Sequence, residues 1–298
     1  MYYTDSYYEI GSSHEVCQDY AATCVRKDMA IAAISDGCSA SHKICGQTDV
    51  GARAYVCSLL SQNMACCLNL LATDTPSKEE IADIIGNRAF LNADTVRVNL
   101  GLSPYALDAT LGVALFYKDR VIVIAYGDLD FVVKTSNIDA PVMYNIVYES
   151  GAPYYLTYDY DTNRGLAYRE EFGKFKVRLL RTYMGNQSSL NCENSVKELG
   201  SSPYEWRKNS VFEFKSAEWI ALFTDGLRSF QKQVDKAPGL IDVSSLVIAN
   251  HLTSFKNFKG CYVIRRMNMF RKRIMMPDRL LHYDDLGIAA ICRVQKDE

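Results

Sequence analysis

The sequence has almost no net charge, and this limits the partners that bulk electrostatics can attract. Its 298 residues hold 33 Lys and Arg against 35 Asp and Glu, which gives a formal charge of −2 and a pI near 6.1. Nucleic acids and anionic membranes attract proteins that carry a marked basic excess. The composition therefore argues against a nucleic-acid partner and against a membrane-surface partner.

Long apolar runs are also missing. A transmembrane helix needs about 18 or more consecutive apolar residues, and the chain has no such stretch. Residues 1–10 are polar and rich in tyrosine, whereas a signal peptide carries an apolar segment there. We therefore expect a cytoplasmic protein with no membrane partner.

Cysteine pairs with ligand spacing are absent as well, although the chain has ten cysteines. Without a CxxC pair, the group Cys38, His42 and Cys45 does not favour a zinc–thiolate site. Cys57 and Cys292 lie within apolar runs. We interpret the thiols as reduced and mostly buried, as in a cytoplasmic protein.

The sequence does contain enough apolar residues for a sizeable core. Hydrophobic residues make up 48% and charged residues 23% of the chain, close to the globular average. Strand-like and helix-like segments follow one another in the order strands, two helices, many strands, helix, strand. This order differs from the strict alternation of a doubly wound sheet and predicts a mixed α/β or α+β fold.

The expected elements follow from hydrophobic periodicity. Strands are predicted at 20–25, 29–34, 109–117, 121–126, 131–134, within 142–183, at 219–223 and at 286–294, and helices at 46–72, 77–101 and 234–257. The letters SKEE at 77–80 form a capping-box pattern that begins a helix. The three middle strands are apolar on both faces, so their sheet is expected to be covered on both sides. Residues 184–210 are polar and predict a surface loop or insertion.

Acidic residues stand at the ends of four predicted core strands. Asp19 precedes the first strand, Asp36 ends the second, Asp225 ends a late strand and Asp284 opens the last. If these strands are neighbours, the four carboxylates meet at one edge and repel one another unless a cation is bound. Oxygen ligands favour Mg²⁺ or Mn²⁺, and Gly37 adds a flexible turn with a free carbonyl. An Asp-Gly pair is also a common turn, so each position alone is open to a purely structural interpretation.

Six segments in this order resemble the metal-dependent protein phosphatase 2C family, in a divergent microbial form. They are CQDYA (17–21), AISDGCSAS (33–41), DATLGVALF (108–116), AYGDLDFVV (125–133), LFTDGL (222–227) and DDLGIAAI (284–291). The resemblance spans residues 11–294 and implies a single phosphatase 2C-like domain over 1–298, with the polar segment 184–210 as a loop or insertion. The implied fold is α+β, a four-layer α-β-β-α sandwich of two mainly antiparallel sheets flanked by helices.

The resemblance implies a metal-dependent serine/threonine phosphoprotein phosphatase. In such an enzyme, water activated at a two-metal centre of Mg²⁺ or Mn²⁺ hydrolyses a phosphomonoester. Asp36 would bridge the two ions and the Gly37 carbonyl would ligate one of them, while Asp225 and Asp284 would ligate the other. The remaining implied positions are Asp19, acting through metal-bound water, and Asp128, at a weaker third metal.

Several residues depart from the family pattern. Gln18 replaces a glutamate, Cys38 stands where animal enzymes carry a histidine suggested as general acid, and Asp285 replaces an asparagine. His14 replaces an arginine that grips phosphate. His14 is a candidate for phosphate binding or proton donation, and a plain surface histidine is the alternative.

Two other functions stay open at this point. The departures fit a catalytically weak regulatory or binding module on the same fold, and the acidic positions also fit a two-metal hydrolase of another phosphoester, such as a nuclease. A cysteine phosphatase is disfavoured because Ile44 stands where a CxxxxxR loop needs arginine. The basic stretch at 265–273 is interpreted as a solvated flap, with phosphopeptide or nucleic-acid docking as the alternative.

Overall fold

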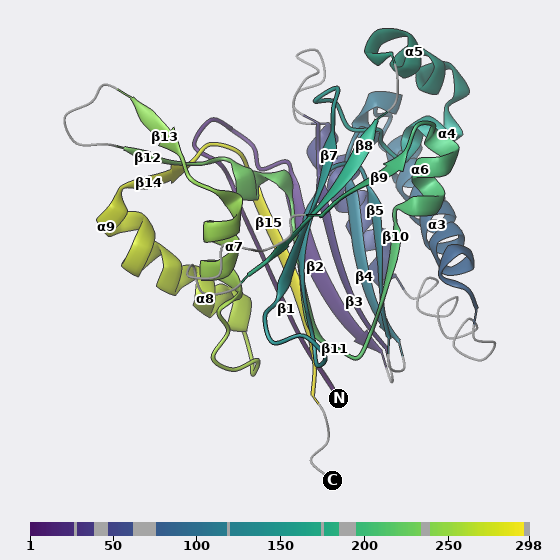
Figure 1. The fold of residues 1–298 in the computed structure, drawn as a ribbon. Helices are drawn as coiled ribbons and strands as arrows, with labels where there is room; N and C mark the ends of the chain where they lie inside the picture. Colours follow the sequence, from purple (N-terminus) through teal and green to yellow (C-terminus); the bar gives the residue numbers. More distant parts are fainter. Residues whose placement is uncertain are drawn as a thin grey trace.

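The computed structural model describes residues 1–26, 29–38, 47–61, 76–117, 120–173, 176–184, 195–233 and 239–294. Two antiparallel sheets pack face to face, and helices cover the outer face of each sheet (Figure 1). This is the α-β-β-α sandwich that the sequence predicts. Within the described residues, no helix combines the length and apolar character needed to cross a membrane.

The first sheet has five strands and carries the helices of the N-terminal half. Its order is β10 (Val211–Lys215), β5 (Arg120–Tyr126), β4 (Leu111–Tyr117), β3 (Met29–Asp36) and β2 (Asp19–Arg26), and its helices are α1 (Thr48–Leu60) and α3 (Lys78–Asn99). The predicted capping box is confirmed at the start of α3. The Glu80 backbone N–H donates to Ser77 Oγ at 3.2 Å, and the Ser77 N–H donates to Glu80 Oε2 at 2.8 Å. Of the helix predicted at 46–72, residues 62–72 lie outside the described residues.

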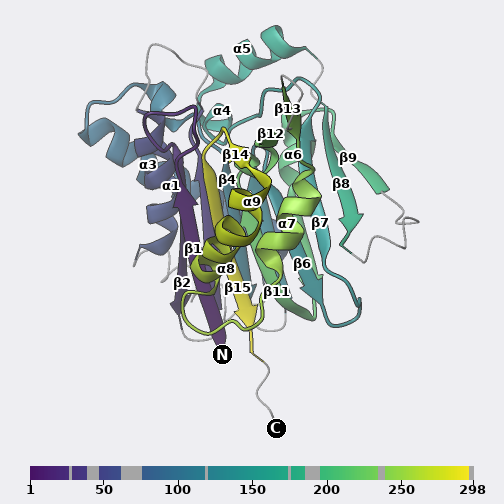
Figure 2. The same ribbon diagram turned by 90° about the vertical axis from the view of Figure 1, so that its left-hand side faces the viewer.

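The second sheet has seven strands and carries the helices of the C-terminal part. Its order is β1 (Tyr2–Glu9), β15 (Leu286–Arg293), β11 (Ala217–Phe223), β6 (Asp130–Thr135), β7 (Val142–Tyr148), β8 (Val177–Tyr183) and β9 (Ser195–Gly200). Helices α7 (Ser245–Thr253) and α8 (Tyr262–Phe270) lie over its outer face (Figure 2). The N-terminal strand β1, which pairs with β15, was not predicted.

The central strands are apolar at consecutive positions because both of their faces are buried. In β11, Ile220 and Leu222 belong to the core shared with the five-stranded sheet, whereas Ala221 and Phe223 pack with the residues of α7 and α8. Side chains alternate across a strand, so a strand between two apolar layers needs apolar residues at every position. The burial predicted for the three middle strands is confirmed, since β4, β5 and β6 are buried along most of their length, but β4 and β5 belong to one sheet and β6 to the other.

The predicted helix at 234–257 is confirmed only in part, because residues 245–253 alone form a helix there. A small third sheet joins β12 (Phe230–Gln233), β13 (Leu240–Asp242) and β14 (Leu280–His282), while residues 234–238 lie outside the described residues. The basic stretch, predicted as a flap, is helical: α8 continues through a π-turn (Arg271–Met275) into α9 (Met276–Asp278).

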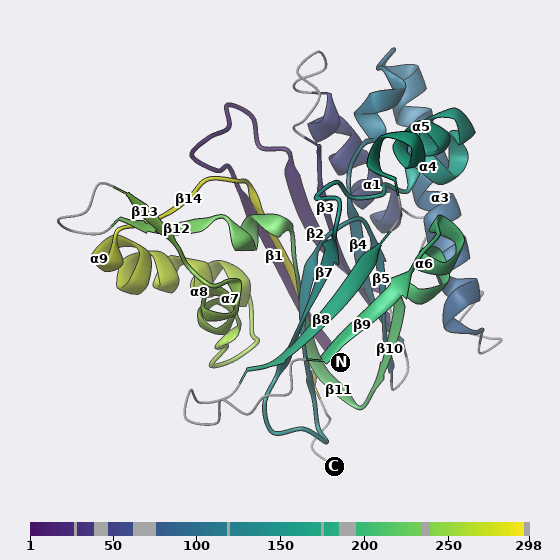
Figure 3. The same cartoon turned by 45° about the horizontal axis from the view of Figure 1, so that its top comes forward.

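Two further segments differ from the prediction. Helices α4 (Thr157–Tyr160) and α5 (Thr162–Phe172) replace part of the strands expected within 142–183, and they lie at the end of the sandwich opposite the chain termini (Figure 3). The segment predicted as a loop contains β9 and α6 (Pro203–Asn209). Trp206 of α6 is fully buried, with its ring 5.6 Å from that of Tyr154. A large aromatic anchor inside a polar segment explains why composition alone misled the prediction.

The thiols agree with the prediction only in part. Cys17, Cys24, Cys38, Cys57, Cys261 and Cys292 are free. Cys292 is buried, Cys57 and Cys261 are exposed, and the other three are partly buried, so the expectation of mostly buried thiols is wrong for the described cysteines. Cys57 lies on an outward-facing position of α1, where an apolar run does not guarantee burial.

Candidate active site

Two of the predicted acids meet where β2 begins and β3 ends. Asp19 and Asp36 are cross-strand partners in the antiparallel pair, and directly opposed residues bring their side chains close together. Each carboxyl raises the other's need for a counter-charge, because both lie away from solvent at the same end of the hairpin. The register of one hairpin therefore creates the first part of the site.

A threonine from the other sheet joins this pair. The Thr224 hydroxyl donates to Asp19 Oδ2 at 2.5 Å and accepts from the Gly287 N–H at 2.8 Å. Thr224 also donates its backbone N–H to the Gly287 carbonyl at 3.1 Å. The residue before the second Asp-Gly thus connects β11 and β15 to β2. This contact explains why a hydroxyl residue ends that apolar run.

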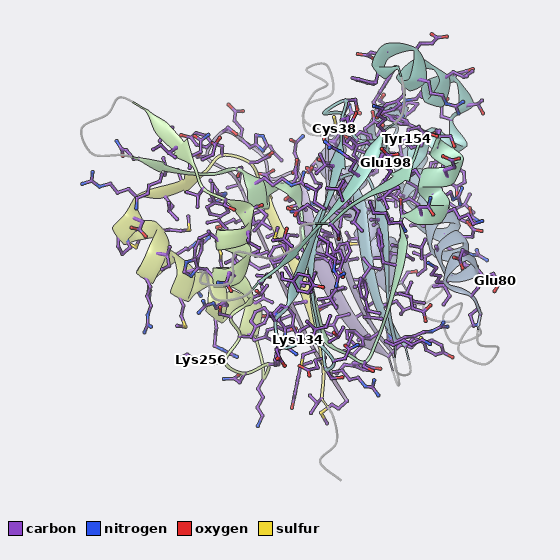
Figure 4. The ribbon with its side chains drawn as sticks, in the orientation of Figure 1. Cys38, Glu80, Lys134, Tyr154, Glu198 and Lys256 are labelled. Atoms are coloured by element: carbon purple, nitrogen blue, oxygen red, sulfur yellow. The ribbon has the colours of Figure 1, made fainter. Side chains whose placement is uncertain are left out.

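A cleft of about 490 Å³ opens at this end of the sandwich. Asp36, Gly37, Asp128, Asp225 and Asp284, five of the six predicted metal-site residues, line it, while Asp19 is fully buried beside Asp36. Cys38, which also lines the cleft, marks this end in Figure 4, far from Lys134 at the opposite end. Strands distant in sequence therefore bring these carboxylates to one surface.

The carboxylates raise one another's pKa. Burial is the largest cause at each of them, and it raises the pKa of Asp19 to about 7. The pKa of Asp36 lies well above its ordinary value because of burial and then of the charges on Asp19, Asp225 and Asp284. Asp225 behaves in the same way, with Asp128 as its strongest acidic neighbour. The site is therefore rich in negative charge that the protein compensates only in part.

Arg228 provides part of that compensation and was not predicted. Its Nε donates to Asp130 Oδ2 at 3.1 Å, and its Nη2 donates to Asp130 Oδ1 at 2.5 Å. Its Nη1 lies 3.8 Å from Asp128 Oδ2. Asp130 is completely buried and also accepts from Asn145 Nδ2 at 2.9 Å. The guanidinium is thus fixed by one aspartate and turned toward another that lines the cleft.

His14 lies against the last pair of acids. Its Nδ1 is 3.1 Å from Asp285 Oδ2, and its Nε2 is 3.7 Å from Asp284 Oδ1. The described residues that line the cleft do not include His14. Its role in phosphate binding or proton donation stays a prediction, and its observed contact is with the two aspartates.

Asp285, which stands where the family pattern has asparagine, binds backbone N–H groups of the N-terminal segment. Its buried carboxylate accepts from the Gly11 N–H at 2.7 Å and from the Gln18 N–H at 2.5 Å. These bonds fix the segment that leads into Asp19. The Gln18 side chain donates to Thr48 Oγ1 at 2.8 Å, at the start of α1, so this position offers no carboxylate to the cleft.

The donor chemistry of the cleft fits a hard divalent cation. Carboxylate oxygens and a backbone carbonyl are the ligands that Mg²⁺ and Mn²⁺ prefer. Within the part of the chain that the structure describes, no three Asp, Glu, His or Cys side chains converge as a coordination group. The fit consists of the donor type and of the uncompensated charge that raises the pKa of Asp36 and Asp225.

The remaining walls of the cleft are aromatic. Tyr105, Tyr155, Tyr158, Tyr168 and Phe172 line it together with Asp108 and Glu171. Burial raises the pKa of the Tyr155 hydroxyl well above its ordinary value, and the nearby Asp36 carboxylate adds to that shift. This aromatic wall was not predicted, because α4 and α5 were not predicted.

These features define a four-layer sandwich with an acidic cleft at one end of its paired sheets. The family model described as protein phosphatase 2C matches residues 10–143. The match covers the N-terminal part of the chain, and there it confirms the resemblance noted in the sequence.

Several solved structures are similar over nearly the whole chain. The serine/threonine phosphatase PstP of Mycobacterium tuberculosis has 10% identity and a TM-score of 0.47, with 99% of each chain covered. Stp1 of Staphylococcus aureus has 11% identity and a TM-score of 0.43, with 99% of this chain and 96% of that chain covered. RsbX in complex with magnesium has 12% identity and a TM-score of 0.44, with 98% and 94% covered. No curated protein matches this chain.

Proposed function

We propose that this chain is a metal-dependent phosphatase that removes phosphate from phosphoserine and phosphothreonine in proteins. The observation that carries the proposal is the group of four aspartates, Asp36, Asp128, Asp225 and Asp284, that line one cleft. Desolvation and mutual repulsion raise the pKa of each carboxyl. Divalent cations would relieve that repulsion, and the match of residues 10–143 to the phosphatase 2C family model supports phosphate ester hydrolysis as the use of such a site.

The residues that would hold Mg²⁺ or Mn²⁺ are Asp36, Gly37, Asp225 and Asp284, with Asp128 at a third position. The chemistry that two such ions supply is a lowered pKa of water and neutralisation of phosphoryl charge. The protein's part is to fix the donors. Asp19 lies opposite Asp36 in the β2–β3 pair, and its carboxylate accepts from the Thr224 hydroxyl.

The test is divalent-cation-dependent release of phosphate from p-nitrophenyl phosphate and from a phosphothreonine peptide. We expect turnover with Mn²⁺ that is abolished by EDTA. Asp36→Asn and Asp225→Asn should each reduce the phosphatase activity by more than about 100-fold. Loss of a residue that only supports a metal ligand reduces activity by about 10–100-fold. Asp139→Asn, at an exposed aspartate outside the cleft, is the matched control.

The same assay separates the alternatives. A wild-type chain that binds the phosphopeptide but releases no phosphate with Mn²⁺ or Mg²⁺ overturns the enzyme proposal and supports a binding module. The Gln18 side chain favours that alternative. It donates to Thr48, and it replaces a glutamate of the family pattern, so one carboxylate is missing at this position. Cleavage of a DNA or RNA oligonucleotide without phosphopeptide turnover would instead support a nuclease.

A cytoplasmic location also belongs to this proposal. Six described cysteines are free, which fits a reducing compartment. Localisation of a tagged chain in fractionated cells is the measurement that checks it.

A further inference from the structure

We propose that the cleft selects phosphorylated segments in which an arginine or lysine lies close to the phosphoresidue. The basic side chain would be bound by the aromatic wall and by Glu171. This inference rests on the phosphatase function proposed above, and it names the class of substrate for that site.

The wall is continuous with the aspartate end of the cleft. Five rings line it, and they come from the turn before β4, from the segment 153–155 and from α4 and α5: Tyr105, Tyr155, Tyr158, Tyr168 and Phe172. Tyr105 is 50% exposed and Phe172 is 37% exposed, so part of this ring surface is open to a ligand. The cleft volume of about 490 Å³ lies in the range of small-ligand sites.

The charged residues of the cleft all have the same sign. Besides the four aspartates of the proposed metal site, the charged side chains that line it in the described chain are Asp108 and Glu171. Asp108 is paired with Arg164. Glu171, which is exposed on the last turn of α5, therefore remains as the carboxylate available to a substrate cation.

The chain's own Arg164 shows what this wall binds. Its guanidinium forms hydrogen bonds to both carboxylate oxygens of Asp108. It also lies 4.5 Å from the ring centroid of Tyr105 and 5.0 Å from that of Tyr158. Ring faces attract guanidinium groups, and a carboxylate beside them adds direct pairing. Aromatic rings and a carboxylate also lie together further along the cleft, at Tyr168, Phe172 and Glu171.

An acidic neighbour of the phosphoresidue would be rejected by the same surface. Like charges brought together on binding reduce affinity, and specificity arises from such repulsion as much as from attraction. A neutral neighbour would gain only the contact with the rings. The cleft therefore ranks substrates as basic above neutral above acidic.

The experiment compares three phosphothreonine peptides of equal length, with Arg, Gln or Glu placed two residues to each side of the phosphothreonine. Phosphate release with Mn²⁺ gives kcat/KM for each peptide. We expect kcat/KM to be about 10-fold higher for the Arg peptide than for the Gln peptide, mainly through KM, because the contact is a cation–π and charge interaction made in the bound state. The Glu peptide should be the poorest substrate.

Variants of α5 locate the preference. Glu171→Gln and Phe172→Leu should each reduce the ratio of kcat/KM for the Arg peptide to that for the Gln peptide by severalfold. Glu170→Gln is the matched control, since Glu170 is an exposed neighbour on the same helix that does not line the cleft, and it should keep the wild-type ratio. A thermal melt of each variant confirms that the fold is retained.

The outcomes separate this inference from the function it rests on. Equal kcat/KM for the three peptides, or a preference for the Glu peptide or for a phosphotyrosine peptide, overturns the inference while Mn²⁺-dependent hydrolysis of p-nitrophenyl phosphate continues. An unchanged ratio in Glu171→Gln also overturns it. The absence of hydrolysis of every substrate overturns the phosphatase proposal, and this inference with it.

Discussion

Asp19 and Asp36 face each other as cross-strand partners in the antiparallel β2–β3 pair. Thr224 from the opposite sheet donates to the same Asp19 carboxyl at 2.5 Å. Antiparallel register thus places two like charges where the fold excludes water, and one threonine ties them to the second sheet. The strain of this arrangement is electrostatic, so pH and cations should control it.

The stability of the metal-free protein should fall as pH rises. Burial raises the pKa of Asp19 from 3.8 to about 7, so the folded chain holds a proton that the unfolded chain releases above pH 4. The stabilisation from that proton is complete below pH 4 and is lost as pH rises toward 7. At about 1.4 kcal/mol for each pKa unit, the free energy of unfolding should decrease by on the order of 2–4 kcal/mol between pH 4 and pH 8. Urea denaturation in EDTA measures this.

Two comparisons check the cause. Asp19→Asn should flatten the pH dependence, while Asp139→Asn should leave it as in the wild type. Added Mg²⁺ or Mn²⁺ should raise the stability at pH 8 more than at pH 5, because a cation competes with the proton for the carboxylates. A metal-free chain whose stability rises from pH 5 to pH 8 would contradict this account.

The fold was predictable where its strands are buried on both faces. The letters of β3 and β11 are apolar at almost every position, and the structure buries both between layers. The prediction failed where burial depends on a few residues in a polar segment. Trp206 anchors α6 by packing against Tyr126, Tyr148 and Tyr154, and no local periodicity reveals such a contact.

The site was predictable to the extent that it consists of strand ends. Asp36, Asp225 and Asp284 come to one cleft because their strands belong to two sheets that face each other. The partners of these acids were not predictable, because they depend on pairing between distant segments. Arg228 and Asp130, for example, are 98 residues apart in sequence. Likewise, the aromatic wall depends on α4 and α5, whose tyrosine-rich letters resemble strands.

A methyl group at Gly226 should be costly. A Cβ there would lie 1.7 Å from the Asp285 carbonyl oxygen, which is a clash with backbone that no rotamer relieves. Gly226→Ala should therefore destabilise the chain by about 3 kcal/mol, at the upper end of overpacking effects, and should shift Asp225 at the cleft. Thermal and urea unfolding measure the loss. Gly239→Ala is the matched control, since a Cβ there meets nothing within 4 Å, and it should stay within about 0.5 kcal/mol of the wild type. Equal stability of the two variants would show that the backbones at Gly226 and Asp285 are not in close contact.

Removal of Arg228 should destabilise the fold through Asp130. Asp130 is completely buried, and without the guanidinium it keeps only the Asn145 amide among its described partners. Breaking a buried ion pair on one side costs about 3–5 kcal/mol, so Arg228→Met should lower the free energy of unfolding by that order. The double variant Arg228→Met with Asp130→Asn should recover much of the loss, because it removes the uncompensated charge.

Lys232→Met is the control for that pair. Lys232 pairs with Asp278 at 3.0 Å, but both side chains are nearly half exposed, so its loss should cost less than about 1 kcal/mol. Urea denaturation at pH 7 of the wild type, Arg228→Met, Asp130→Asn and the double variant gives the coupling energy between Arg228 and Asp130. A coupling near zero would contradict the view that this ion pair stabilises the fold.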